Sequence, residues 1–390
     1  MIDFDIPVNR RNTNTWKWDG EGKGAQFPMG TADMDFRMPE EIRAAIHEKV
    51  DQCILSYACD KSYFGKAFAK YQKKRYGLDI KPEEVMPGTA LMAVFKVILE
   101  AFTAAGDGVI VQTPVFGPIY TVTKNNGRML FDNALLYNRE EGTWSINFEE
   151  LEEMAKNPRV RMLVICNPGN PCTRGFTKEE MQRMYDICNA NDVIVLSDEI
   201  HSDFVFKGEH HVLASLKKEY ADITITCTAP SKTFNLAGLQ ISNLFIPNDS
   251  LRRRFKRELD AAGYSQLGIM GLVACEAAYA HGGEWYEAVL KYIKANIDYT
   301  REYVDNNIPG VHMSEHEGTY LVWLDFRDLG LSPAEQEHLI VDEAGLWLDG
   351  GSIFGKTGIG FERINVACPR ATLKEALERI ERAVKNLTQK

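Results

Sequence analysis

The sequence has 390 residues, of which 45% are apolar and 26% charged, a composition typical of a globular protein with room for two domains. Its formal net charge is −10, so we expect no nucleic-acid partner. No apolar run approaches the roughly 20 residues of a membrane span, and the first residues lack the apolar centre of a signal peptide. We therefore expect a cytoplasmic protein that does not enter a membrane.

The eight cysteines give no sign of a disulfide framework or a zinc site. None forms a C-x-x-C pair, and Cys166, Cys188, Cys227 and Cys275 lie inside apolar runs. That pattern is typical of buried thiols in a reducing compartment. We expect no bound metal.

Patterning along the chain first predicts an α/β region. Residues 1–45 show little regular pattern and lead into a helix predicted over 39–51. From about residue 85 to 250, short apolar runs alternate with amphipathic helices, which is the signature of a parallel sheet. The apolar runs lie at residues 108–112, 161–166, 193–197 and 223–227.

After residue 285 the pattern changes. Helical periodicity over 284–307 gives way to strands predicted at 319–326 and 361–367, and an amphipathic helix over 371–387 ends the chain. We expect an α/β fold in which a large domain with a mostly parallel central sheet accompanies a smaller α+β domain. The predicted large domain covers 46–284, and the predicted small domain combines 1–45 with 285–390.

Polar or aromatic side chains follow each of the four apolar runs. Ligands of open parallel sheets bind outside the carboxyl ends of the strands, so these side chains should meet at one edge. A single such residue is usually a surface residue or a helix cap, whereas a ring, an amide, a carboxylate and an amine together form a constellation. In strand order they are Phe116 and Tyr120, Asn167 and Asn170, Asp198 and His201, and Lys232.

A further segment predicts an anion site. Gly88 and Thr89 precede a predicted helix in "MPGTALMAVFKVILEAF", and the backbone N–H groups and dipole of a helix N-terminus hold phosphate. Pyridoxal phosphate uses all of these parts: a lysine amine bonds its aldehyde carbon, a carboxylate faces its ring nitrogen, and an aromatic side chain stacks on its ring. The sequence therefore predicts pyridoxal 5'-phosphate as the cofactor.

The motifs around these residues resemble a known family. The segments "SDEIH", "APSKTFNLAGLQ" and "CNPGNP" are similar to those of the fold-type I aminotransferase superfamily, whose members bind pyridoxal phosphate. The segments "MGTADMDF" and "FGKTGIGFERINVACPR" resemble its MalY/PatB-type cystathionine β-lyase branch, which consists of carbon–sulfur lyases. The resemblance runs from about residue 15 to the C-terminus, and it implies aminotransferase fold type I and a homodimer with shared active sites.

The resemblance also implies a role for each candidate residue. Lys232 would carry the cofactor and act as the base, Asp198 would face the ring nitrogen, and Arg363 in "GFERINVA" would bind the substrate α-carboxylate. The other implied cofactor contacts are Asn170 at the phenolic oxygen, His201 beside Asp198, Phe116 on the ring face, Gly88, Thr89, Ala90 and Ser231 at the phosphate, and Tyr57 at the phosphate of the neighbouring subunit.

Some positions depart from the family pattern. Gly30 and Thr31 replace a Trp-Val pair that is common in the branch, and Gln240 stands where classical aminotransferases carry a phosphate-binding arginine. We therefore expect neutral donors to bind the phosphate. Substrate preference is the property for which these departures matter most.

The implied reaction is α,β-elimination from cystathionine or an S-substituted L-cysteine, which gives pyruvate, ammonia and a thiol. Lys232 would remove the Cα proton, and Lys232 or Tyr120 would protonate the departing thiolate. Transamination shares every step up to loss of the Cα proton. An aminotransferase acting on an apolar or aromatic amino acid is therefore the alternative.

A different motif suggests a rival function. Residues 350–357 match the nucleotide-binding pattern G-x-x-x-x-G-K-[ST], which requires a buried strand before it and a helix after it. An alternating strand follows here instead, so we interpret the match as a coincidence within a loop near the substrate. The sequence leaves open a third class, a pyridoxal phosphate protein that works mainly as a regulator or partner-binding module.

Overall fold

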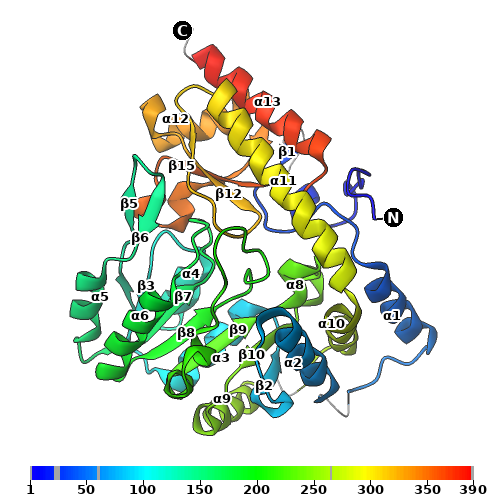
Figure 1. Cartoon of the computed structure of the whole chain (residues 1–390), viewed down its shortest axis with the longest axis vertical. Helices are drawn as coiled ribbons and strands as arrows, with labels where there is room; N and C mark the ends of the chain where they lie inside the picture. Colours follow the sequence, from blue (N-terminus) through cyan, green and yellow to red (C-terminus); the bar gives the residue numbers. More distant parts are fainter. Residues whose placement is uncertain (1, 22–26, 59–61, 264–265, 388–390) are drawn as a thin grey trace.

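The computed structural model describes residues 2–21, 27–58, 62–263 and 266–387 (Figure 1). Its centre is a seven-stranded sheet with the strand order β2-β10-β9-β8-β7-β3-β4. The strands from β9 to β4 are parallel to one another, while β10 runs antiparallel to both β2 and β9. The strands are β2 (Val85–Gly88), β3 (Gly108–Val111), β4 (Met129–Asp132), β7 (Val160–Cys166), β8 (Ile194–Asp198), β9 (Thr224–Thr228) and β10 (Ser242–Phe245).

Helices cover both faces of this sheet, which is why the central strand β3 and most of β7 are buried and apolar instead of alternating. Val109 and Val111 of β3 pack in one apolar cluster with α3, α4 and α9, whereas Ile110 packs in another with α5 and α6 on the opposite face. The covering helices are α3 (Leu91–Phe102), α4 (Pro118–Asn125), α9 (Asp249–Ala261), α5 (Phe148–Ala155) and α6 (Lys178–Ala190). The expected mostly parallel sheet in an α/β fold is confirmed.

A second sheet lies in the upper part of Figure 1. It has four antiparallel strands in the order β11-β12-β15-β14. The long helix α11 packs against α13, the last helix of the chain. The elements are β11 (His312–Met313), β12 (Leu321–Asp325), β14 (Asp349–Gly350), β15 (Phe361–Asn365), α11 (Gly283–Asn307), α12 (Pro333–His338) and α13 (Arg370–Leu387).

The N-terminal segment joins this second sheet region. β1 (Phe27–Pro28) pairs in parallel with β13 (Leu346–Trp347), so the start of the chain lies beside its last third. One apolar core includes residues from the N-terminal segment, from the helices α1 (Glu40–Asp51), α2 (Ser62–Tyr76) and α10 (Ile269–His281), and from the second sheet. The remaining small sheet is the hairpin of β5 (Leu136–Asn138) and β6 (Thr143–Ser145).

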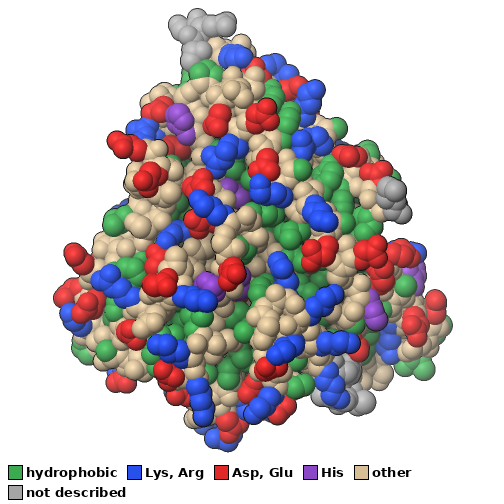
Figure 2. Space-filling view, in the orientation of Figure 1, with side chains coloured by type: hydrophobic (Ala, Val, Ile, Leu, Met, Phe, Trp, Pro, Cys, Tyr) green, Lys and Arg blue, Asp and Glu red, His purple; other side chains and the backbone are tan. Residues whose placement is uncertain are grey.

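The surface seen in Figure 2 mixes lysine and arginine with aspartate and glutamate over most of its area. Among the described helices, none combines the length and apolar character that crossing a bilayer requires. Six of the described cysteines are buried free thiols, and Cys53 is exposed.

Candidate active site

The four predicted strand ends meet at one edge of the large sheet. β3, β7, β8 and β9 are consecutive neighbours, and the register pairs Cys166 with Asp198 and Asp198 with Cys227. The ends of these three parallel strands therefore lie level with one another to within one residue. Lys232 follows the fourth strand on the short helix α8 (Pro230–Thr233).

Lys232 lies at the centre of this edge, in a partly buried position. Its Nζ donates a hydrogen bond of 2.7 Å to the backbone oxygen of Ala32. Burial, together with the positive charge of Arg363, lowers the pKa of Lys232 to about 8. A substantial share of this amine is therefore neutral near physiological pH and can act as a nucleophile or base.

Asp198 and His201 are buried beside this amine. Burial raises the pKa of Asp198 to about 7, and its Oδ1 accepts a hydrogen bond of 3.2 Å from the backbone N–H of Ile200. Burial also holds the pKa of His201 well below its ordinary value, with further contributions from Lys232 and Arg363. Neither ring nitrogen of His201 has a hydrogen-bond partner in the described part of the chain. Both groups thus keep polar atoms available for a ligand.

Arg363 on β15 connects the second sheet to this edge. Its Nη1 donates to Asn170 Oδ1 at 2.7 Å, and its Nη2 donates to the backbone oxygen of Gly30 at 3.1 Å and to Asp349. The side chain is buried, and its Nε has no partner among the described residues. The structure therefore brings together two residues that lie far apart in the sequence, Asn170 and Arg363. The sequence analysis missed Asp349, which precedes the predicted strand as an ordinary acidic residue.

The N-terminal segment that carries Ala32 is held by a buried ionic network. Lys17 is fully buried and pairs with Asp35 at 2.7 Å, while Arg10 pairs with Asp33 at 2.7 Å. Because buried charges require partners, these pairs hold the segment firmly beside the strand ends. This explains why the irregular start of the chain is ordered next to Lys232.

The predicted phosphate cradle lies at the start of α3. Ala90 caps this helix without a side-chain hydrogen bond, so the N–H groups of its first turn remain without intrahelical acceptors. A Cβ atom added to Gly88 would lie 2.5 Å from Val94, so this position requires glycine. Ser242 donates a hydrogen bond of 2.6 Å to the carbonyl of Thr89 and fixes the turn. Ser231 is partly exposed on α8, directly before Lys232.

Phe116 and Tyr120 follow β3, as predicted. Phe116 is half-buried, and none of the described aromatic rings stacks on it. The Tyr120 hydroxyl donates a hydrogen bond of 2.7 Å to the carbonyl of Phe354, and burial raises its pKa, so this hydroxyl stays protonated at neutral pH. Tyr120 therefore ties the β3 loop to the loop that precedes Arg363.

Asp203 is a second residue that the sequence analysis missed. Its Oδ2 accepts a hydrogen bond of 2.6 Å from Thr233, the neighbour of Lys232, while its Oδ1 accepts hydrogen bonds from Tyr71 and Tyr76. The buried carboxylate thus anchors α8 to α2. The only sequence signal was its place shortly after Asp198 in "DEIHSD".

The nucleotide-binding alternative lacks its structural context. Residues 350–357 span the end of β14 and two 3₁₀ turns, Gly351–Phe354 and Lys356–Gly358, and β15 follows directly. A phosphate-binding loop of that type needs a helix at this point, so the sequence match is a coincidence.

Comparison with known proteins places the chain in a family. The family model for aminotransferase class I and II matches residues 26–380. The chain belongs to this family. It is 37% identical to cystathionine beta-lyase PatB of Bacillus subtilis (strain 168), over 98% of this chain and 100% of that protein.

Two solved structures of proteins that contain pyridoxal phosphate also match this chain over nearly its whole length. The crystal structure of cystalysin from Treponema denticola, which contains pyridoxal 5'-phosphate, matches with a TM-score of 0.95 and 35% identity, covering 99% of this chain and 100% of that one. A pyridoxal phosphate-bound C-S lyase from Staphylococcus hominis matches with a TM-score of 0.90 and 29% identity over 98% of both chains. The predicted aminotransferase fold type I and the predicted branch are confirmed.

The residues at the strand ends also fit the cofactor that the family implies. Among the described residues the ring nitrogens of His201 have no partner, the carboxyl of Asp198 is buried, and the pKa of Lys232 is low. These three side chains can therefore supply a donor, an acid and a nucleophile to a polar ring. The uncapped N-terminus of α3 supplies donors for a phosphate.

Proposed function

We propose that the protein is a pyridoxal phosphate-dependent carbon–sulfur β-lyase that cleaves cystathionine or S-substituted L-cysteines. The observation that carries this proposal is the full-length similarity to a cystathionine beta-lyase, joined to the meeting of Lys232, Asp198, Asn170 and Arg363 at one sheet edge. Water and the substrate give pyruvate, ammonia and a free thiol.

Pyridoxal phosphate, when bound, supplies an electron-accepting ring that stabilises negative charge at the substrate Cα. In this proposal Lys232 would hold it covalently, Asp198 would face its ring nitrogen, and Asn170 would donate to its phenolic oxygen. His201 would lie beside Asp198, and Phe116 would cover the ring. Gly88, Thr89 and Ala90 at the start of α3, together with Ser231, would bind the phosphate.

Arg363 binds the substrate α-carboxylate. Its guanidinium offers parallel donors, and its buried Nε lacks a partner among the described residues, so the Nε–H can donate a hydrogen bond to a further acceptor group. Asp349 and Asn170 hold the guanidinium plane on either side. The bound carboxylate then fixes the direction of the Cα–H bond.

Lys232, released as a free amine when the substrate takes its place, removes the Cα proton. Its pKa of about 8 lies close to neutral pH, which is where the pKa of an efficient general base should lie. Lys232 then gives this proton to the departing sulfur; if the hydroxyl of Tyr120 protonates the sulfur instead, the proton held by Lys232 restores that hydroxyl. The Tyr120 hydroxyl donates a hydrogen bond to the carbonyl of Phe354 in the free protein, so it must break that hydrogen bond before it can protonate the sulfur.

The second candidate is an aminotransferase for an apolar or aromatic amino acid. The description of the matching family supports transamination but names no substrate. The deciding experiment incubates the holoenzyme with L-cystathionine in the absence of any 2-oxo acid. Pyruvate and thiol formed in equal amounts support the lyase. Activity that appears only after a 2-oxo acid is added would refute it and favour the aminotransferase.

We further propose a homodimer in which Tyr57 reaches the phosphate of the second subunit. Tyr57 is 85% exposed within one chain, and it follows the exposed Ile54 and Leu55. The buried free cysteines favour a cytoplasmic location, and we keep 46–284 as the large domain and 1–45 with 285–390 as the small one. Mixing inactive Lys232→Ala and Tyr57→Ala proteins should restore some activity if the sites are shared, and none if they are not.

A further inference from the structure

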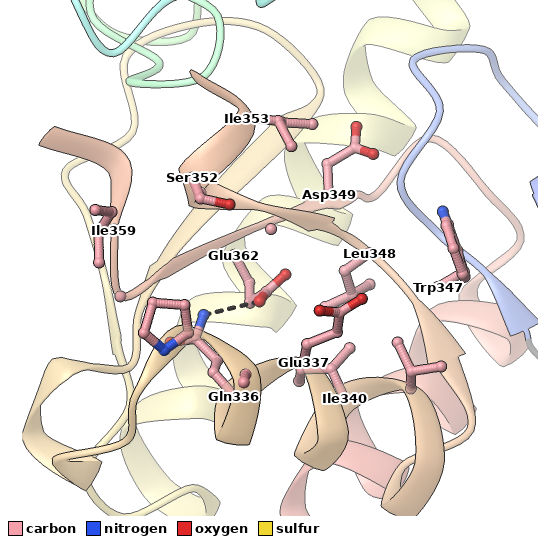
Figure 3. A pocket seen from close by; sticks show the side chains of 16 residues that line it. Gln336, Glu337, Ile340, Trp347, Leu348, Asp349, Ser352, Ile353, Ile359 and Glu362 are labelled. Atoms are coloured by element: carbon pink, nitrogen blue, oxygen red, sulfur yellow. Dashed lines mark hydrogen bonds between the residues drawn. The ribbon is translucent and has the colours of Figure 1, made fainter. Parts of the chain in front are cut away.

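A cavity of about 520 Å³ lies behind the candidate active site, between α12 and the strands β14 and β15 (Figure 3). Glu362 and Arg363 are neighbours on β15, so their side chains leave opposite faces of the strand. Arg363 reaches the active site, whereas Glu362 lines this cavity. The cavity, which we call the outer cavity, thus has Glu362 on the face of β15 opposite to Arg363, and it extends to Asp349 on the edge strand β14. Its volume falls within the range of small-molecule sites, about 300–1,000 Å³.

Glu362 is the polar centre of the outer cavity. Its side chain is buried, with 4% of the residue exposed, and its Oε1 accepts a hydrogen bond of 2.8 Å from Gln336 Nε2. Its second oxygen makes no hydrogen bond, and no cation pairs with it, within the described part of the chain. Burial raises the pKa of Glu362 to about 8, and the charges of Asp349 and Glu337 act in the same direction. A buried carboxyl without a counter-charge costs stability unless something pairs with it.

The remaining lining matches a cation with an apolar body. Glu337 stands exposed on α12, and in Figure 3 its carboxyl group and that of Glu362 lie toward the same space. Asp349 also lines the cavity, but it is already paired with Arg363. No lysine, arginine or histidine lines the outer cavity as the structure describes it. The walls are apolar, formed by Ile340, Val341, Leu348, Ile353 and Ile359.

We propose that the outer cavity binds a small organic cation, a guanidinium or ammonium group on a short apolar chain, through Glu362 and Glu337. A guanidinium suits the paired oxygens of a carboxylate, and the aliphatic walls suit the chain. A metal ion is a poor match, because no cluster of three metal-ligating side chains exists among the described residues. When the cation binds, Glu362 loses its proton to solvent and forms the ion pair, so charge and protons balance.

The test uses the holoenzyme and n-propylguanidinium chloride in isothermal titration calorimetry, with N-propylurea as the uncharged probe of the same shape. A primary amine is avoided because it could react with the cofactor. We expect saturable binding of the cation, no binding of the urea, and at least about a tenfold loss of affinity in Glu362→Gln, because a charged hydrogen bond is lost. Glu337→Gln should weaken binding less, since this residue is exposed. Glu140→Gln, an exposed glutamate of another loop, should have no effect.

Proton release provides a second readout. The pKa of Glu362 is raised, so the free carboxyl is mostly protonated at pH 7, and binding should release protons and strengthen as pH rises through about 8. The neighbouring charged groups are Glu337, Asp349 and the Arg363 that pairs with Asp349, while the guanidinium probe stays charged throughout. Equal affinity for the urea, unchanged affinity in both variants, or a shift of the visible cofactor spectrum on binding would each overturn the proposal. The spectrum separates this site from the active site, so the outcome does not depend on the lyase reaction.

Discussion

Replacing Arg363 by lysine removes a specific pair of contacts. The guanidinium holds Asn170 at 2.7 Å through Nη1 and Gly30 at 3.1 Å through Nη2, and it retains donors for a substrate carboxylate. A lysine side chain is shorter and ends in a single amine, so it cannot hydrogen-bond Asn170 and a substrate carboxylate at once in the way that the planar guanidinium can. Losing one charged hydrogen bond in a buried site costs about 1.5–3 kcal/mol. At 1.36 kcal/mol per factor of ten, kcat/KM should fall by about 10- to 150-fold.

The assay for Arg363→Lys measures kcat/KM for release of thiol from L-cystathionine. Arg327→Lys is the matched control, because Arg327 also binds a carboxylate, that of Asp325, but lies outside the site. We expect the control to retain wild-type kcat/KM. If Arg363→Lys stayed within about twofold of the wild type, Arg363 would not be the carboxylate-binding group, and the reasoning would fail.

Further predictions concern the cofactor and its support. Asp198→Asn should keep the fold, since a pKa of about 7 means that the buried carboxyl is already about half protonated at neutral pH, and an amide has nearly the same shape. The variant should nevertheless lower kcat by about a hundredfold or more, because an amide cannot present a negative charge to the ring nitrogen of the cofactor. Reconstitution of the cofactor-free protein should accelerate as pH rises and level off just above pH 8, because the pKa of Lys232 is lowered to about 8. In Arg363→Gln the pH at which the reconstitution rate is half-maximal should be higher, because the positive charge that helps lower the pKa of Lys232 is gone. Thr233→Val should lower the free energy of unfolding in urea by about 1–3 kcal/mol, because Asp203 loses a buried hydrogen bond.

Three of these predictions would be refuted by the following results. Near-normal kcat in Asp198→Asn would remove that residue from the ring-nitrogen position. A reconstitution rate that keeps rising to pH 10 would show that Lys232 titrates like an exposed lysine. Unchanged unfolding of Thr233→Val would mean that Asp203 does not support α8.

The sheet and its strand ends could be predicted because they depend on local patterns. Apolar runs buried on both faces, as in 108–112 and 161–166, read as parallel strands, and the order of polar residues after them follows from the parallel arrangement. The start of α6 is also set by a local pattern, since Thr177 and Glu180 form a capping box there.

The partners across the two sheets could not be predicted in this way. The contact between Asn170 and Arg363, and the pairing of Arg363 with Asp349, join segments far apart in the chain, and no local period reports such contacts. The buried Lys17 is a similar case, because a lysine in an irregular segment reads as exposed until its partners Asp33 and Asp35 are placed. The outer cavity also depends on tertiary packing, since alternation on β15 gives the direction of Glu362 but not the space in front of it.

The most direct test of the account is to locate the cofactor on the chain. The holoenzyme is reduced with borohydride, digested, and its pyridoxyl-bearing peptide identified by mass spectrometry. The account predicts a single label on the peptide that contains Lys232, at the meeting point of the four strand ends. A label on any other lysine, or the absence of a label in protein that retains its cofactor, would contradict it.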